Sequence, residues 1–195
     1  MTHIRILMTG MTGPLIASIF VGCGGVFTAK PLTQTTATEL RKPLTGTWVT
    51  GDNALQIRFD SNGVGHIGGV QWDKKKERFT LTEGELRAVK TADQRFLSVR
   101  FRNEDGSWPG EHSLLAYNVL DSGDWIIWSA DENAFAKVVE NETLAGKVQK
   151  DEKITRVTLT GKPVAILKAI SDDDAAGLFN YRKPVVLRKL PREKK

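Results

Sequence analysis

The sequence predicts an α+β protein: an antiparallel β-meander that curls into a barrel-like sheet, with two helices in its C-terminal half. Between residues 44 and 129, short segments rich in β-branched and aromatic residues alternate between apolar and polar, which is typical of half-buried strands. Clusters of Gly, Asn and Asp separate these segments. After residue 129 the apolar residues take up the spacing of amphipathic helices. Sequential short strands with tight turns indicate a meander that curls or closes.

The expected strands follow one another closely in the first part of this region. They are 44–50, 54–59, 63–70, 78–82, 84–91, 95–101, 113–120 and 125–129. Turns are expected between them at 51–53, 60–63, 83–84, 103–106 and 121–124. Successive side chains of a strand point to opposite faces, so Phe96 is expected on the other face of its strand from Leu97. Trp125 and Trp128 are likewise expected on opposite faces of one strand, both of them covered.

The C-terminal half is expected to combine helices with a few further strands. Helices are expected over 131–142 and 163–171, strands near 144–149 and 154–160, and a closing strand at 185–187. Ser129 or Asp131 is expected to cap the first helix, because short polar side chains accept hydrogen bonds from free N–H groups there. Pro163 suits the first turn of the second helix, where its missing N–H costs nothing.

The first 22 residues have the composition of a secretory signal peptide. They contain no acidic residue, and the base Arg5 precedes an apolar run that starts at Ile6. Two glycines and Pro14 interrupt the run. A permanent membrane-spanning helix is disfavoured, since it needs roughly 20 predominantly apolar residues.

The run ends in the tetrapeptide Phe20-Val21-Gly22-Cys23, and Cys23 is the only cysteine of the chain. The tetrapeptide resembles the lipobox of bacterial lipoproteins, with Phe20 where that family prefers Leu. The resemblance implies cleavage before Cys23 and a membrane anchor of acyl chains on that residue, since two or more chains give a stable anchor. Gly24, which is not Asp, implies sorting to the outer membrane if the host has one. The alternative is a soluble secreted protein cut near Gly25.

The remainder of the chain is expected to form a linker and one domain. Residues 24–43 contain five Thr and two Pro without apolar periodicity, so 23–43 is expected to be the lipid anchor and a flexible linker. Residues 44–195 are expected to form a single β-rich domain with a basic C-terminal tail. No second cysteine is present, so no intramolecular disulfide is expected.

The formal net charge of +5 is concentrated at the C-terminal end. Residues 182–195 contain seven basic residues against one acidic residue, which leaves the rest of the chain near neutral. This distribution argues against a nucleic-acid partner. Within the tail, Arg192, Lys194 and Lys195 are candidates for contact with an anionic envelope surface. Alternatively, the basic residues around 185–187 protect the edge of the sheet.

Gly46-Thr47-Trp48 resembles the Gly-x-Trp signature of lipocalin-like barrels. The resemblance implies that Trp48 plugs one end of a barrel and that a basic residue of the last strand, here Arg188, packs over it. It also implies a small apolar ligand inside the barrel. The alternative is that Trp48 is an ordinary core residue.

No catalytic, cofactor-binding or metal-ligating residue is identified, and no cofactor is expected. After the expected signal peptide only His66 and His112 remain, and the turn at 60–63 lacks the oxygen ligands of a calcium loop. Trp108 lies in an expected loop and is the aromatic residue favoured for a surface contact.

The favoured function is that of an exported, lipid-anchored envelope protein that acts as an interaction or structural module. The alternative is a lipocalin-like binder of small ligands, and an enzyme is least favoured. An apolar cavity of ~300 Å³ or more would favour the ligand binder, whereas a filled core would favour the interaction module.

Overall fold

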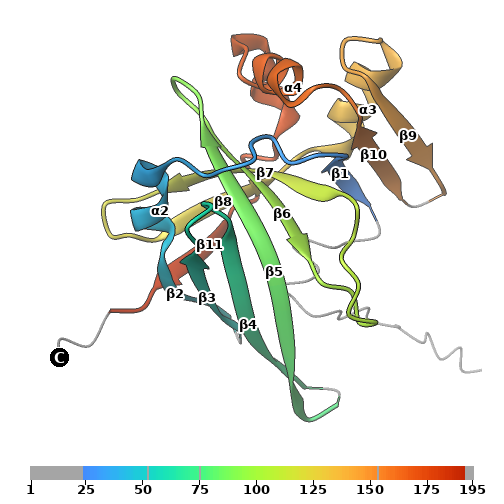
Figure 1. Cartoon of the computed structure of the whole chain (residues 1–195). Helices are drawn as coiled ribbons and strands as arrows, with labels where there is room; N and C mark the ends of the chain where they lie inside the picture. The colour runs from blue at the N-terminus through green and yellow to red at the C-terminus, as the bar shows by residue number, and fades with distance from the viewer. Residues whose placement is uncertain (1–23, 52, 75, 153, 192–195) are drawn as a thin grey trace, which may run out of the picture.

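The computed structural model describes residues 24–51, 53–74, 76–152 and 154–191, and their strands form a closed antiparallel barrel (Figure 1). Eight strands close the ring in the order β2-β3-β4-β5-β6-β7-β8-β11, with β11 returning to β2. They are β2 (Gly46–Thr50), β3 (Asn53–Phe59), β4 (Gly65–Asp73), β5 (Arg78–Lys90), β6 (Arg95–Phe101), β7 (His112–Val119), β8 (Trp125–Ser129) and β11 (Val185–Lys189). The predicted β-rich α+β fold with a curled meander is confirmed.

The remaining elements lie outside this ring. They are β1 (Gly25–Thr28), α2 (Thr38–Leu44), α3 (Glu132–Glu140), β9 (Gly146–Lys150), β10 (Thr155–Leu159), α4 (Pro163–Ile170) and the 3-10 helix η1 (Asp173–Leu178). β1 pairs in parallel with β10 and antiparallel with the start of β7, so the barrel sheet continues outward through β1, β10 and β9. Figure 1 shows α3 and α4 gathered on the same side of the molecule as this extension.

Two apolar clusters hold the fold together, one on each side of the barrel wall. The inner cluster contains Trp48, Leu97 and Trp125, and the outer cluster contains Phe96, Phe135 and Phe179. Successive residues of one strand belong to different clusters, because side chains of a strand alternate between its faces. The predicted opposition of Phe96 to Leu97 and of Trp125 to Trp128 is therefore confirmed.

The helix boundaries follow from local chemistry. Asp131 caps α3, since its Oδ1 accepts hydrogen bonds from the N–H groups of Asn133 (3.0 Å) and Ala134 (2.8 Å). Pro163 occupies the first turn of α4, as predicted. Both predicted helices and the predicted strand pair between them are present within a few residues of their expected ends.

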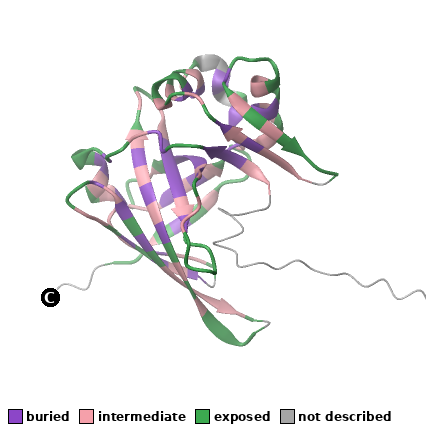
Figure 2. Cartoon of the chain, turned by 45° about the vertical axis from the view of Figure 1, so that its right-hand side comes forward, coloured by how far each residue is buried: buried purple, intermediate pink, exposed green. Residues whose placement is uncertain are grey.

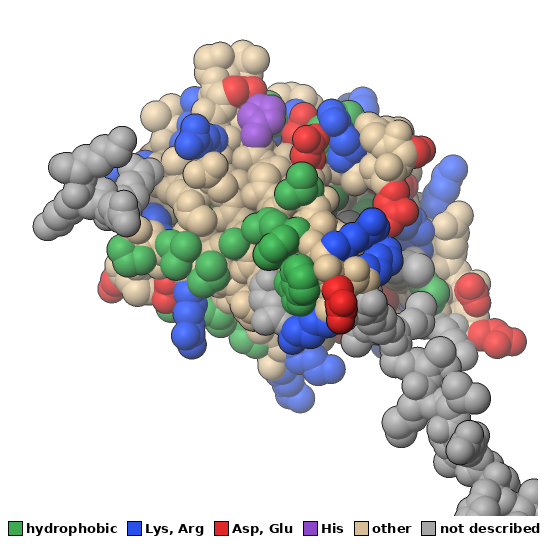
Figure 3. Space-filling model, turned by 90° about the horizontal axis from the view of Figure 1, so that it is seen from below, with side chains coloured by type: hydrophobic (Ala, Val, Ile, Leu, Met, Phe, Trp, Pro, Cys, Tyr) green, Lys and Arg blue, Asp and Glu red, His purple; other side chains and the backbone are tan. Residues whose placement is uncertain are grey.

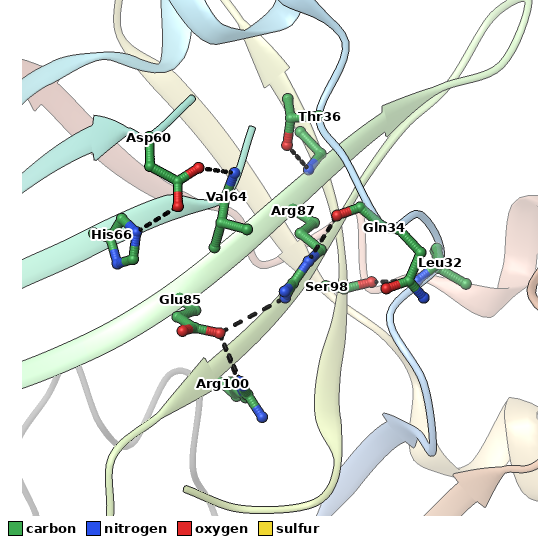
Figure 4. Close-up of polar contacts among 11 residues, drawn as sticks. Leu32, Gln34, Thr36, Asp60, Val64, His66, Glu85, Arg87, Ser98 and Arg100 are labelled. Atoms are coloured by element: carbon green, nitrogen blue, oxygen red, sulfur yellow. Dashed lines mark hydrogen bonds and ion pairs between the residues drawn. The ribbon is translucent and has the colours of Figure 1, made fainter. Parts of the chain in front are cut away.

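The prediction of a flexible linker over 24–43 is wrong. Its first part forms β1, where Val26 and Thr28 are buried, and its last part forms α2. Between them, the N–H of Leu32 donates to Ser98 Oγ (2.9 Å) and Thr36 Oγ1 accepts from the N–H of Ala88 (3.0 Å), which binds the segment to β5 and β6 (Figure 4). The threonines of this segment favour a linker by composition, but Thr36 is buried and accepts a hydrogen bond from the barrel wall. The folded domain therefore includes β1 and α2, which precede the predicted start at Leu44.

Two smaller expectations also change. No turn occurs at 83–84, because β5 runs through Gly84 as one strand of 13 residues and turns after Lys90 instead. A Cβ on Gly84 would lie 2.7 Å from Phe101 Cδ1, so this glycine makes room for a ring inside the barrel rather than for a turn. The last strand, β11, pairs on both sides and is not a sheet edge, so its basic residues do not protect one.

Candidate functional site

The interior of the barrel is filled by side chains. A cavity of about 20 Å³ lies between the inner faces of the strands, and it is lined by apolar residues such as Leu55, Leu86 and Trp125. A void of this size holds about one water molecule. Pockets for small organic ligands measure roughly 300–1,000 Å³, so this cavity offers no room for one.

Trp48 is buried in this interior, which both of its interpretations require. It is 0 % exposed, and its ring centroid lies 4.8 Å from that of Trp125. The basic residue over its ring is Lys189, whose Nζ lies 5.5 Å from the ring centroid. The prediction that Arg188 fills this place is wrong. Leu187 is buried inside, so Lys189 shares its side of the strand while Arg188 points outward and is exposed.

A row of charged side chains covers the outer face of β5 and β6. Glu85 Oε2 accepts hydrogen bonds from Arg100 Nε (3.0 Å) and Nη2 (2.7 Å), and Arg87 Nη1 lies 3.7 Å from the same oxygen (Figure 4). Trp108 lies against this row, with the guanidinium groups of Arg100 and Arg102 each 5.0 Å from its ring centroid. Trp108 is half-buried rather than exposed, because cation–π contacts hold its loop against the barrel. Its role in binding a partner stays a prediction.

The two histidines lie in different environments and contact different groups. His66 Nε2 lies 3.1 Å from Asp60 Oδ2 in the exposed turn after β3 (Figure 4). Hydrogen bonds from the Val64 N–H and from His66 lower the pKa of Asp60. Asp60 also accepts the Val64 N–H at 2.9 Å, so the segment 60–63 forms the predicted hairpin turn.

His112 is buried at the start of β7, and neither ring nitrogen has a hydrogen-bond partner among the residues that the structure describes. Burial lowers its pKa to about 4, and the cations Arg100 and Arg87 add to this effect. Among the residues that the structure describes, no group of three or more His, Cys, Asp or Glu side chains could hold a metal ion.

A half-open groove of about 410 Å³ lies at the rim of the barrel, beside the turn between β5 and β6. Its lining residues are Lys90, Ala92, Asp93, Gln94, Arg95, Ala116, Tyr117, Asn118, Trp128 and Tyr181. Trp128 and Tyr181 form an aromatic pair with ring centroids 5.2 Å apart, and Arg95 Nη1 donates to Asn118 Oδ1 (2.5 Å). Burial raises the pKa of Tyr117 to about 12, so its hydroxyl stays protonated at neutral pH.

Two polar atoms in the wall of this groove, Gln94 Oε1 and Trp128 Nε1, are buried without a hydrogen-bond partner among the described residues. Sequence analysis did not find this groove. The turn at 91–94 was not expected, and Tyr181 reaches Trp128 from a segment more than fifty positions further along the chain.

Several predicted site residues fall outside the described part of the chain. Cys23, the expected lipidation site, is one of them, and Arg192, Lys194 and Lys195 of the basic tail are the others. Their roles stay predictions.

No protein-family model, curated protein or solved structure matches this chain. Within residues 24–191, apart from the three positions left undescribed, no helix is long and apolar enough to cross a membrane.

Proposed function

We propose that this chain is an exported lipoprotein, attached to a membrane through Cys23, whose domain acts by contacts on its outer surface. The observation that supports a surface role is the filled barrel. A cavity of about 20 Å³ is more than tenfold smaller than the ~300 Å³ that an internal ligand requires. The barrel then serves as a rigid scaffold, and its outer wall, rim and hairpins present the groups that bind.

The anchor and the folded domain lie close together in this proposal. β1 starts at Gly25, so Gly24 is the one residue between a lipidated Cys23 and the sheet. A Cβ on Gly24 would lie 2.9 Å from the carbonyl oxygen of Thr155, which places this residue against the end of β10. A lipid on Cys23 would hold the domain against the bilayer rather than at the end of a tether on the order of 25 Å long.

Labelling with a radioactive or clickable palmitate tests the anchor. The wild-type chain should incorporate the label and remain in the membrane fraction, whereas Cys23→Ser should do neither, because the thioether requires the cysteine sulfur. Equal labelling of the two proteins would overturn the proposal. Replacement of Phe20 by Leu provides a control, since it brings the tetrapeptide closer to the preferred lipobox and should not reduce labelling.

The rim groove supports a second candidate, the binding of a small polar ligand. At about 410 Å³ the groove falls in the range of known ligand pockets. Its unpartnered atoms are an acceptor, Gln94 Oε1, and a donor, Trp128 Nε1, and leaving each unpaired costs about 1–3 kcal/mol. Both atoms are shielded from solvent in this structure, so a ligand reaches Gln94 Oε1 and Trp128 Nε1 only after these two side chains move.

A ligand that carries both hydroxyl donors and acceptors, such as a sugar, would match these atoms and could stack on the exposed ring of Tyr181. Titration with mono- and disaccharides, followed by tryptophan fluorescence, tests this candidate. Trp128→Phe keeps a ring but removes the N–H, and should weaken a response that Val164→Ser leaves unchanged.

A further inference from the structure

The hairpin of β4 and β5 extends beyond the body of the barrel (Figure 1). Its two strands pair from Gly65 with Leu86 out to Asp73 with Arg78. The ladder between β5 and β6 starts at Gly84, and one further hydrogen bond joins the Arg102 N–H to the Glu83 carbonyl oxygen (2.9 Å), so residues 78–82 of β5 pair with β4 alone among the described strands. The end of this hairpin projects away from both apolar clusters, and much of it is exposed (Figure 2).

The outward face of the projecting part is apolar. Ile67 and Leu86 point into the barrel, so by alternation the cross-strand pairs Val70–Leu81 and Trp72–Phe79 lie on the outer face. Leu81 is 84 % exposed and Phe79 is 67 % exposed, the largest and the third-largest values among the large hydrophobic side chains that the structure describes, with Val164 at 72 % between them. Figure 3 shows hydrophobic side chains gathered beside basic ones on the face of the molecule seen from below.

Stability of the hairpin explains only part of this arrangement. Trp72 and Phe79 meet edge to face with ring centroids 4.9 Å apart, and such a cross-strand pair helps to hold two strands together. Leu81 gains little by burial, because most of its surface remains in water. A contiguous exposed apolar surface of this kind marks a contact site.

Basic residues lie at the tip, next to the apolar face. Residues 73–78 contain four bases and two acids, and Asp73 Oδ1 also accepts the N–H of Lys76 (3.1 Å) in the turn. Lysine is depleted in the cores of protein–protein interfaces, whereas it is favoured beside anionic lipid headgroups. Tryptophan likewise prefers the boundary between headgroups and acyl chains. The combination favours a lipid surface over a protein partner.

We propose that the β4–β5 hairpin inserts Phe79 and Leu81 into the headgroup boundary of a bilayer that contains anionic lipids, with Lys76 and Arg78 contacting the headgroups. The hairpin would provide a second attachment that does not require a lipid on Cys23. Contact between the hairpin and the bilayer would orient the domain, because the lipid on Cys23 and the hairpin tip would hold it to the membrane at two separate points.

The test uses the full chain with Cys23→Ser, which removes its only cysteine and any acyl anchor. Leu81→Cys then introduces a unique thiol for an environment-sensitive fluorophore, and Val164→Cys provides a matched control. Val164 is 72 % exposed on α4, comparable to Leu81. Vesicles of phosphatidylcholine mixed with phosphatidylglycerol should shift the emission of the label at 81 to the blue and leave the label at 164 unchanged.

Charge provides the second arm of the experiment. Pure phosphatidylcholine vesicles should give a weaker response at position 81. The double variant Lys76→Gln/Arg78→Gln should raise the concentration of anionic vesicles that gives half the maximal shift about 20- to 30-fold, because each base near an anionic surface increases the affinity about fivefold. No shift at 81 with either vesicle would overturn the proposal. Equal shifts at 81 and 164 would also overturn it, because they would reflect attachment through another part of the chain. Palmitate labelling of Cys23 is independent of these outcomes, so the two proposals can fail separately.

Discussion

The two apolar clusters of this protein are built in different ways. The inner cluster draws mainly on strands β2 to β8, which follow one another in the chain, and each strand contributes every second side chain. Leu40 and Leu44 of α2 and Leu187 of β11 complete it. The outer cluster joins segments that lie far apart in the chain. Val26 of β1 pairs with Val157 of β10, and the ring centroids of Phe96 and Phe179 lie 5.5 Å apart. Local sequence therefore specifies the barrel interior, whereas the layer outside it depends on contacts between distant segments.

The largest expected effect comes from removing the first segment of the outer layer. A chain that begins at Leu44 lacks β1, the buried outer-cluster residues Val26 and Leu32, and Leu40 of the inner cluster, and it exposes the outer wall of the barrel. We expect this chain to lose cooperative thermal unfolding and to aggregate, because β7 and β10 lose the strand that joins them.

A chain that begins at Gly24 is the matched control and should melt in one transition. Circular dichroism on heating compares the two. If the chain from Leu44 melted as cooperatively as its control, β1 would not be an integral part of the domain.

A pair of adjacent residues compares the two clusters directly. Phe96→Ala empties a site in the outer cluster and should cost ~3–5 kcal/mol, while Leu97→Ala empties one in the inner cluster and should cost ~2–5 kcal/mol. Because β6 contributes to both clusters, each change should lower the midpoint of a single transition. Urea unfolding, followed by both tryptophan fluorescence and far-ultraviolet dichroism, measures this. Separate transitions by the two probes for Phe96→Ala would show that the outer layer unfolds by itself.

The same difference explains what the sequence could and could not predict. Alternation within strands correctly placed Phe96, Leu97, Trp125 and Trp128, because a period of two is a local property of the chain. The segment 24–43 was assigned to a linker, because its threonines and prolines suggest a loop and its partners lie far away in sequence.

A local pattern also failed where one residue of offset decides the outcome. Arg188 and Lys189 are both basic and adjacent, and only the burial of Leu187 shows which of them faces Trp48. The rim groove could not be predicted from local sequence, because Trp128 and Tyr181 come from segments that lie far apart in the chain.

His112 lies where β1 joins the barrel wall, so its titration tests that junction. Its pKa in the folded protein is lowered to about 4 from the ordinary 6.5, because burial disfavours the charged ring. The neutral form is therefore favoured by folding, and its contribution is complete above pH 6.5. Stability should fall by about 2 kcal/mol as the pH drops from 6.5 to 4.

Other groups titrate in the same range, so the comparison with His112→Gln isolates the effect. Unfolding free energies in urea at pH 7 and at pH 4.5 should differ more for the wild type than for the variant. The same pH dependence in both proteins would mean that His112 is already accessible to protons in the folded state.

The smallest expected effect concerns two glycines that lie on neighbouring strands and face opposite sides of the barrel wall. A Cβ on Gly84 would lie 2.7 Å from Phe101 Cδ1 inside the barrel, whereas a Cβ on Gly68 would meet nothing within 4 Å. Gly84→Ala should thus cost ~1–3 kcal/mol by overpacking, and Gly68→Ala should stay within ~0.5 kcal/mol of the wild type. Phe101→Leu provides the rescue, since a smaller side chain leaves room for the added methyl group, and Gly84→Ala should then cost less than in the wild-type background. Urea unfolding of the wild type, the three single variants and the double variant measures each step. Equal tolerance of Gly84→Ala and Gly68→Ala would show that the barrel interior has room for the added methyl group.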